Sequence, residues 1–305
     1  MTEPPDVSRS RTFLFVPGDK PGRFSRAAAS GADAIVIDLE DAVLPAHRAA
    51  ARRHIVDWLD SLPAGPTRPT ITVRVNEARS TDLAHDLHAL QEAPHLDALV
   101  VPKFGDPASL EACASMTQSI IGIVESGAGL LGISSIGRLP QQVVRLSFGA
   151  GDFAADTGAV WEPDNPALHL ARCQVSWASA AHSLPGPIDT AFPWLADQDG
   201  LRREALLARG AGYRGKYCIH PDQVPLVASS MGPSGVDVDW AQRVLLLWEG
   251  DGGADSSGAL RLDNALIDEA VVKKAHAILA EADDSTRSEI PTAAPEDPPR
   301  SNRTP

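Results

Sequence analysis

The segments IIGIVESGAG (residues 120–129) and VVRLSFGAGDF (residues 143–153) are both apolar runs that lead into a carboxylate within a glycine-rich turn. The first delivers Glu125 and the second Asp152. A run that is apolar throughout is typical of a strand buried on both faces of a parallel sheet. The end of such a strand is rigid, and the glycines let a ligand approach the main chain closely. Together the two segments predict an acidic site at one edge of a parallel sheet.

The same pattern recurs along the chain and indicates the fold class. Alanine- and leucine-rich segments with helical spacing lie between many of the apolar runs, so strand and helix alternate eight times. This order favours a (β/α)8 TIM barrel with right-handed crossovers. The seventh run is short and begins with proline, so an open doubly wound sheet is the alternative. Strands are expected at residues 12–16, 34–38, 70–75, 98–102, 119–124, 143–148, 187–189 and 216–220.

Length and composition indicate one catalytic barrel with additions at both ends. A barrel of about 250 residues fits within the 305 residues, and we expect it over residues 10–231. Residues 232–282 are predicted to form a C-terminal helical lid or oligomerisation segment, whose last helix begins at Ala265. The apolar positions of that helix require a partner surface, either the barrel or a neighbouring subunit; they are Val271, Val272, Ala275, Ile278 and Leu279. A flexible N-terminus is expected over residues 1–9 and a disordered tail over residues 283–305.

The charge and the absence of long apolar runs restrict the class of partner. A net charge of −13 argues against a general nucleic-acid surface. No run approaches the roughly 20 apolar residues that span a bilayer, and the first residues lack the apolar segment of a secretory signal. The three cysteines show neither metal-binding spacing nor a disulfide framework. We therefore expect a cytoplasmic protein that binds neither nucleic acid nor membrane.

Polar side chains follow the predicted strands at their carboxyl ends, where a (β/α)8 barrel carries its active site. A barrel with a purely structural role has little reason to collect this much charge on one rim. The pattern therefore predicts an active site assembled from several strands. In chain order the candidates are Asp19, Asp38, Glu40, Asp41, Arg74, Asn76, Lys103, Glu125, Asp152, Asp189 and His220.

Glu125 and Asp152 are the expected metal ligands. Magnesium prefers oxygen ligands and usually keeps waters, so two carboxylates and substrate oxygens suffice. Zinc is disfavoured because the sequence offers no cluster of His and Cys. The structural alternatives are that Glu125 caps the helix beginning near Ala128 and that Asp152 only orders its own turn.

Arg74 is expected to bind a substrate anion, because an inward guanidinium on a strand is costly without a matching negative charge. A salt bridge to Glu40 is the alternative, and the two roles are compatible. Glu40 and Asp41 are expected to orient Arg74 or the waters of the metal. Lys103 as a Schiff-base lysine is a poorer account, and His220 is expected to be packed and hydrogen-bonded rather than a base.

Seven separated blocks of the sequence carry a family resemblance: FLFVPGDKPGRFSRAAASGADAIVIDLEDAV, ITVRVN, VVPK, IVESGAG, LSFGAGDFAADTG, GYRGKYCIHPDQV and DNALIDEAVVKKAHAIL. Through them, residues 11–282 resemble the citrate lyase β-subunit-like branch of the HpcH/HpaI aldolase family. The resemblance implies a TIM barrel that binds Mg²⁺ and cleaves or forms carbon–carbon bonds in acyl-CoA or acyl-carrier-protein thioesters. It implies a homotrimer or hexamer.

The resemblance also implies roles for individual residues. Glu125 and Asp152 match the family's metal ligands, and Arg74 matches its substrate-binding arginine. Asp268, in the LID block, matches an aspartate that in related CoA lyases reaches over the site of an adjacent subunit and exchanges a proton with the acetyl methyl carbon. The predicted catalytic residues are Arg74, Asp268 and Glu40; the predicted substrate-binding residues are Arg74, Glu125, Arg23 and Arg48, the last two near the CoA phosphates.

The expected reaction gives a 2-keto acid and acetyl-CoA from a short β-hydroxyacyl-CoA thioester of the citramalyl-CoA, malyl-CoA or citryl-CoA type. Three alternatives remain open at this point: a malyl-CoA-type thioesterase, a citrate lyase β subunit acting on an acyl-carrier-protein thioester, and a non-catalytic ligand-binding barrel.

Overall fold

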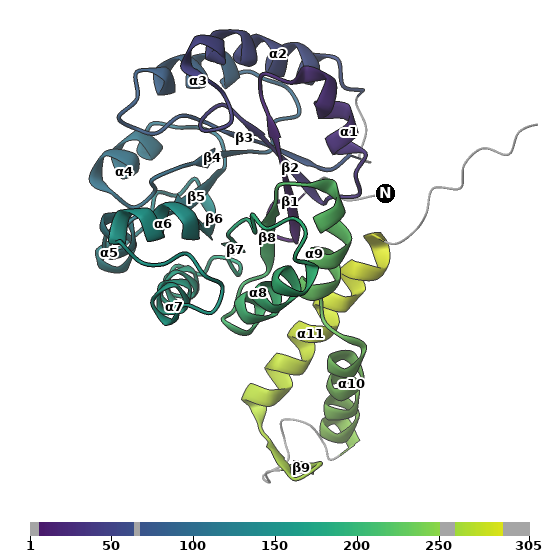
Figure 1. Ribbon diagram of the computed structural model, residues 1–305. Helices are drawn as coiled ribbons and strands as arrows, with labels where there is room; N and C mark the ends of the chain where they lie inside the picture. The colour runs from purple at the N-terminus through teal and green to yellow at the C-terminus, as the bar shows by residue number, and fades with distance from the viewer. Residues whose placement is uncertain (1–5, 64–67, 251–259, 289–305) are drawn as a thin grey trace, which may run out of the picture. The chain divides into compact units, whose positions relative to one another are not determined.

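The protein forms a closed barrel of eight parallel strands in chain order, β1 to β8 (Figure 1). The computed structural model describes residues 6–63, 68–250 and 260–288, with side chains described as far as residue 282. The predicted TIM barrel is confirmed and the open sheet is excluded, although β7 has only 2 residues. The strands are β1 (Thr12–Pro17), β2 (Ala34–Asp38), β3 (Thr70–Arg74), β4 (Ala98–Val101), β5 (Ile120–Val124), β6 (Val143–Phe148), β7 (Ile188–Asp189) and β8 (Gly215–Cys218).

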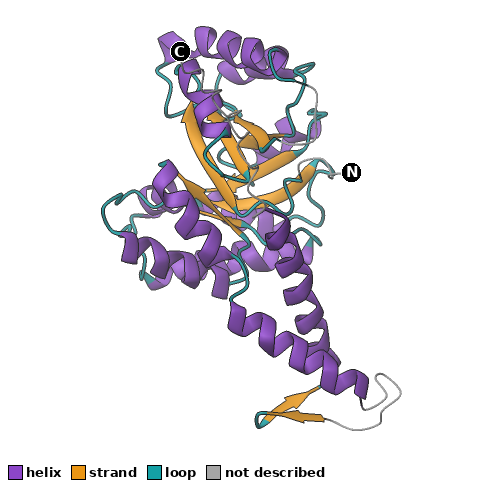
Figure 2. Ribbon diagram, turned by 90° about the vertical axis from the view of Figure 1, so that its right-hand side faces the viewer, coloured by secondary structure: helices purple, strands orange, loops and turns teal. Residues whose placement is uncertain are grey.

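Helices surround the strands on the outside of the barrel (Figure 2). Several begin at residues that suit a helix start. Asp106, Asn165 and Asp197 each accept a hydrogen bond from a main-chain N–H of the following turn. The helices of the barrel are α1 (Phe24–Ala28), α2 (Arg48–Asp60), α3 (Asp82–Leu90), α4 (Pro107–Ala114), α5 (Gly127–Ser135), α6 (Ala150–Thr157), α7 (Pro166–Ala181), α8 (Gln198–Gly210) and α9 (Val224–Met231), with short 3₁₀ turns η1 (Pro21–Arg23), η2 (Pro45–His47) and η3 (Pro221–Gln223).

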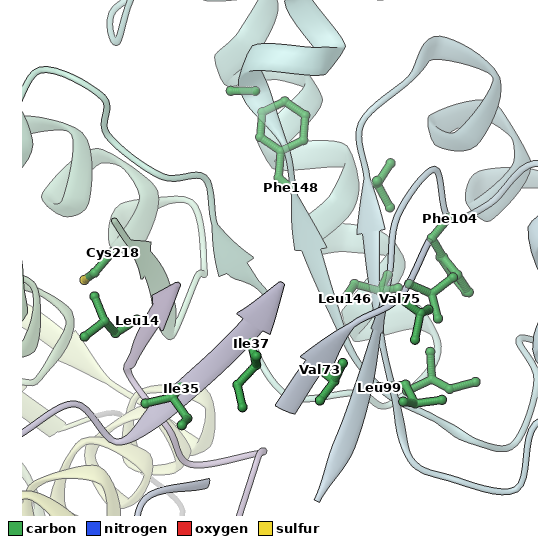
Figure 3. Packing of buried hydrophobic residues seen from close by; sticks show 14 of the residues in the cluster. Leu14, Ile35, Ile37, Val73, Val75, Leu99, Phe104, Leu146, Phe148 and Cys218 are labelled. Carbon is green, nitrogen blue, oxygen red and sulfur yellow. The ribbon is translucent and has the colours of Figure 1, made fainter. Parts of the chain in front are cut away.

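The alternation of side chains along each strand divides the core into two layers. Leu14, Ile35, Ile37 and Val73 project outward from neighbouring strands and join the layer shared with the helices (Figure 3). The intervening positions, such as Phe13 and the other members of the inner cluster, fill the barrel interior. A residue's position along its strand therefore decides whether it faces the interior or the helices.

Residues 6–10 close the amino-terminal end of the barrel, which corrects the expectation of a flexible start up to residue 9. Val7 is 7% exposed and packs with the interior cluster. The fully buried guanidinium of Arg145 donates to the carbonyl oxygens of Val7 (2.8 Å) and Ser10 (2.7 Å). These contacts explain the order, because a buried cationic donor is costly without acceptors. Residues 1–5 lie outside the described residues.

The chain after Met231 forms a second compact unit. It contains α10 (Gly235–Gly250), β9 (Leu260–Leu262), β10 (Ala265–Ile267) and α11 (Glu269–Ser288). The prediction that the last helix begins at Ala265 is wrong, because residues 265–267 pair with β9 through a turn in which Asp263 and Asn264 adopt positive φ. Helix α11 also continues through residues 283–288, where we expected a tail; residues 289–305 lie outside the described residues.

Helix α10 supplies much of the partner surface that the apolar positions of α11 require. Figures 1 and 2 both show the two helices side by side within this unit. Val272 and Ala275 share a buried cluster with Ala241, Val244 and Ile267, so the expectation that only the barrel or another subunit could cover them is corrected. None of the helices, within the part of the chain that the structure describes, is long and apolar enough to cross a bilayer.

Candidate active site

The candidate site lies at the carboxyl ends of β2, β3, β5 and β6, and strand alternation aims its side chains. Ile121 and Ile123 belong to the interior cluster, so Glu125, two positions further on, faces the same side. The same spacing relates Asp38 to Val36 on β2. Asp152 comes from the first turn of α6, directly after β6. The predicted convergence of these strand ends is therefore a consequence of the pleat.

Arg74 is held by three carboxylates, more than the single salt bridge considered from the sequence. Its Nε and Nη2 each donate to Asp38 at 2.7 Å, and its Nη1 donates to Asp41 at 3.1 Å. Glu40 Oε2 lies 2.9 Å from the same Nη1. The ring of Phe15 packs beneath the guanidinium, 5.1 Å from Cζ. Arg74 is thereby fixed in one orientation by its partners.

Asp38 is the residue whose role the sequence analysis did not identify. It lies in register with Arg74 on the neighbouring strand, so the two side chains share a face of the barrel. Its side chain is almost fully buried and also accepts from the main-chain N–H groups of Glu40 and Ala42. In the sequence, Asp38 could have been identified as the partner of Arg74 only from its place at the end of a predicted buried strand, since the next predicted strand carries Arg74.

Glu40 has an unusual protonation equilibrium. Burial raises the pKa of its carboxyl to about 8; Arg74 opposes the shift, and Asp41, Glu125 and Asp38 add to it. Its Oε2 is close to Arg74, yet it is not aligned for a hydrogen bond within the described structure. Burial outweighs the ion pair at Glu40, because Asp38 already accepts from Nε and Nη2 of Arg74.

Glu125 and Asp152 converge on one cationic group, the ammonium of Lys103. The Nζ atom lies 3.1 Å from Asp152 Oδ1 and 3.5 Å from Glu125 Oε1. Lys103 also holds Glu125 by its main chain, whose N–H donates to the same Oε1 at 2.9 Å. Burial raises the pKa of Glu125 more than Lys103 lowers it, while burial lowers the pKa of Lys103 less than the two carboxylates raise it. The geometry makes a Schiff-base role for Lys103 a poor fit.

The donor set suits a hard divalent cation. Two carboxylates already lie around one positive charge, and the five acidic groups of the site exceed its two basic groups, Arg74 and Lys103. Gly149 leaves room for this arrangement, because a Cβ there would lie 2.7 Å from Glu125 Oε2. No cluster of three or more His, Cys, Asp or Glu side chains suited to a metal is found among the described residues. A cation that keeps several waters, as magnesium does, fits two protein ligands.

A cavity of about 350 Å³ adjoins these groups. Its lining includes the charged residues Arg74, Glu125 and Asp152 together with Phe15, Trp161 and other apolar or aromatic residues. A volume of this order suits a small organic acid and one end of a larger ligand. The mixture of charged and aromatic walls would fix the orientation of a carboxylate beside the cation position.

The structural alternative for Glu125 is excluded. Ser126 caps α5, its side chain accepting from the N–H of Gly129 at 3.0 Å, and Glu125 points away to Lys103. Asp152 does lie in the first turn of α6, where a negative charge is favourable. Its side chain is half exposed and pairs with Lys103, so turn formation does not account for its position.

Asp189 does not belong to the site, which corrects its inclusion among the strand-end candidates. Ile188 faces the barrel interior, so Asp189 faces the helices. There it joins a closed ring of buried ion pairs: Arg172 and Lys216 each bridge Asp189 and Glu204, with N–O distances of 2.7 to 2.8 Å. Pairing compensates the burial of all four charges, so this cluster is structural.

Two further candidates also have structural contacts. His220 caps η3, accepting from Asp222 N–H at 3.2 Å, which agrees with a hydrogen-bonded rather than a basic role. Asn76 is buried and donates to Asp86 and to the carbonyl oxygen of Leu39.

The two arginines that were predicted to bind the CoA phosphates, Arg48 and Arg23, differ in whether an ion pair already holds the side chain. Arg48 donates to Asp82 at 2.8 Å, and Arg52 contacts the same carboxylate, so Arg48 would have to leave Asp82 to meet a phosphate. Arg23 is exposed in η1 and makes no ion pair with the part of the chain described. Of the two, Arg23 is the one available to a phosphate in this conformation.

Asp268 lies in the second unit and is the N-cap of α11. Its Oδ1 accepts from the N–H of Val271 at 3.0 Å, and its residue is exposed. Its Oδ2 makes no hydrogen bond within the described residues. The carboxylate is therefore held at a helix start with one oxygen open to a ligand.

The closed barrel, with its acidic site and cavity at the carboxyl ends of the strands, has the architecture of a (β/α)8-barrel enzyme. A profile of the family described as HpcH/HpaI aldolase/citrate lyase matches residues 11–221. The chain belongs to this family, and we class it as a carbon–carbon lyase.

Individual relatives match over nearly their whole length. The citrate lyase subunit beta-like protein of Deinococcus radiodurans is 33% identical over 92% of this chain and 99% of its own. The L-malyl-CoA/beta-methylmalyl-CoA lyase of Cereibacter sphaeroides is 30% identical over 92% and 96%, respectively. The structure of CitE from Mycobacterium tuberculosis with magnesium, acetoacetate and coenzyme A has a TM-score of 0.77 and 28% identity, covering 91% of this chain and 100% of that chain.

Proposed function

We propose that the protein is a magnesium-dependent lyase that cleaves or forms the carbon–carbon bond of a short β-hydroxyacyl-CoA thioester, giving a 2-keto acid and acetyl-CoA. The observation that carries this proposal is the convergence of Glu125 and Asp152 on one cationic group beside the cavity that Arg74 lines. The relatives named above support it, since one is a malyl-CoA lyase and another was solved with magnesium and coenzyme A.

Glu125 and Asp152 would hold the magnesium ion, which when bound acts as a Lewis acid and template for the oxygens of the keto acid or hydroxy acid. The main-chain N–H of Lys103 keeps Glu125 in position for this task. Asp152 is half exposed, so its carboxylate can reorient toward a ligand.

Arg74 would stabilise the negative charge that develops on the thioester oxygen as the acetyl enolate forms. Asp38 accepts two hydrogen bonds from the guanidinium, so Arg74 would need little reorientation during the reaction. Glu40 would act as a positioning residue for Arg74. Tyr217 and Phe15 contact each other at 5.0 Å and form an apolar wall of the cavity, which helps exclude water from the enolate.

Asp268 would exchange a proton with the methyl carbon of the acetyl group. In a homotrimer or hexamer, each subunit would place its Asp268 over the barrel site of a neighbouring subunit. Its exposure and its open Oδ2 support this role. Arg23 would meet a CoA phosphate, with Arg48 as a second group if it leaves Asp82.

The test is to incubate purified protein and magnesium with a panel of citramalyl-CoA, malyl-CoA and citryl-CoA and to measure keto acid, acetyl-CoA and free CoA by mass spectrometry. Equal amounts of keto acid and acetyl-CoA are expected. Free CoA without a keto acid would instead indicate a thioesterase, and turnover only with an acyl-carrier-protein thioester would indicate a citrate lyase β subunit. Magnesium binding without any turnover across the panel would favour a ligand-binding barrel.

A further inference from the structure

Lys103 contacts the two candidate metal ligands through both its main chain and its side chain. The main-chain N–H donates to Glu125 Oε1, whereas the ammonium lies between Glu125 and Asp152. Lys103 has a positive φ of 51°, and the next residue, Phe104, is fully buried and donates its N–H to the carbonyl oxygen of Ile123 at 2.8 Å. The backbone is thus fixed on both sides of a flexible side chain.

We propose that the Lys103 ammonium is an internal counter-cation, which occupies the space between Glu125 and Asp152 and is displaced from Asp152 when a divalent cation binds. This inference rests on the proposed function, because it assigns these two carboxylates to the metal. Magnesium bonds oxygen at about 2.1 Å. A divalent cation held by Glu125 and Asp152 would need the region between the two carboxylates that the ammonium fills, 3.5 Å from Glu125 Oε1 and 3.1 Å from Asp152 Oδ1.

The side chain is able to make this movement. The Lys103 side chain is 34% exposed and Asp152 is 50% exposed, so water can replace their ion pair at little cost. Glu125 is only 4% exposed and stays in place through the main-chain hydrogen bond, which does not depend on the side chain at position 103. The Lys103 ammonium can therefore move away while Glu125 keeps its position.

The arrangement has a direct consequence for affinity. Without the ammonium, Glu125 and Asp152 would lose the cation that they share. The ammonium lowers the repulsion between the two carboxylates in the metal-free protein and so weakens the binding of magnesium alone.

The experiment is titration of the metal-depleted full-length protein with magnesium chloride by isothermal titration calorimetry, with no keto acid present. Lys103→Met keeps the main-chain bond to Glu125, has similar length and lacks the charge. We expect it to bind magnesium about threefold or more tightly than the wild type, the scale of losing competition from one partly exposed ion pair. Lys103→Arg, which keeps the charge, should bind no more tightly than the wild type.

Lys20→Met is the matched control. Lys20 follows β1 at the same end of the barrel but pairs with Asp19, at 3.0 Å, so its removal changes the net charge equally without touching the two ligands. Its affinity for magnesium should equal that of the wild type.

The outcomes separate the two proposals. If Lys103→Met binds magnesium with unchanged or lower affinity, or if Lys20→Met tightens binding as much, the counter-cation role is overturned while the metal site stands. If neither the wild type nor Lys103→Met takes up magnesium, the proposed function itself fails. Circular dichroism of each variant establishes that the barrel is folded before titration, and Lys103→Gln serves as a second neutral variant.

Discussion

In the metal-free wild type, the free energy of unfolding should fall as the pH rises, because Glu40 loses its proton. Replacing Glu40 by glutamine should abolish this fall. The pKa of Glu40 is raised from 4.5 to about 8, chiefly by burial. Between these two pH values the folded protein keeps a proton on Glu40 that the unfolded chain has lost. The unfolded state then binds fewer protons, so the free energy of unfolding falls with increasing pH. The stabilising contribution is complete below pH 4.5 and is lost as the pH passes about 8.

The size of the effect follows from the shift. A displacement of about 3.5 pH units at about 1.4 kcal/mol per unit sets an upper limit of about 5 kcal/mol. Glu40 keeps 9% exposure, so water and side-chain movement relieve part of the penalty, and we expect about 2–3 kcal/mol. The glutamine side chain of the Glu40→Gln variant has nearly the same size and shape but does not ionise.

The assay is urea denaturation with EDTA at several pH values from 5 to 9, comparing the wild type with Glu40→Gln. The advantage of the variant should grow with pH and level off above about pH 8. Glu111→Gln, the same change at an exposed position of α4, should shift the midpoint equally at every pH. A difference between the wild type and Glu40→Gln that stays flat from pH 5 to 8 would show that Glu40 is already ionised and paired with Arg74.

Three further changes test other parts of the structure. Gly149→Ala would place a Cβ 2.7 Å from Glu125 Oε2 and should weaken magnesium binding about tenfold or more by calorimetry, whereas Gly127→Ala, which meets nothing closer than 3.6 Å, should leave it unchanged. Lys216→Met should cost about 3–5 kcal/mol in urea denaturation, because it leaves two buried carboxylates short of a partner; a cost below about 1 kcal/mol would contradict this account. Asp268→Asn should abolish exchange of the acetyl-CoA methyl protons, followed by NMR in deuterium oxide, with magnesium affinity retained; continued exchange would remove the proton-transfer role.

The candidate metal ligands were predictable because their signals are local. Glu125 and Asp152 each follow an apolar strand and stand in a glycine-rich turn, and parallel strands in a barrel bring their carboxyl ends to one rim. Arg74 was predictable for a related reason, since an arginine within an alternating strand needs an anion. The anion that holds it, Asp38, was not identified, because the pairing depends on the register between β2 and β3.

Asp189 shows why a strand-end position alone is insufficient. The strand that carries it has 2 residues, too few for an alternation pattern to reveal which face is buried. Its direction is decided by the neighbouring strand, where Lys216 lies in register with it, and by the side chains of Arg172 and Glu204 from α7 and α8. No spacing in the sequence links these four residues.

By itself the sequence determined the order of strands and helices, the barrel and the strand ends that carry charge, because hydrophobic periodicity depends on residues close together in the chain. Only the tertiary structure decided that the Lys103 ammonium lies between Glu125 and Asp152, that Glu40 is buried enough to hold its proton, and that Asp189 turns away from the site. Those outcomes depend on burial and on the balance of charges among distant segments, and both are set only when the strands close into a barrel.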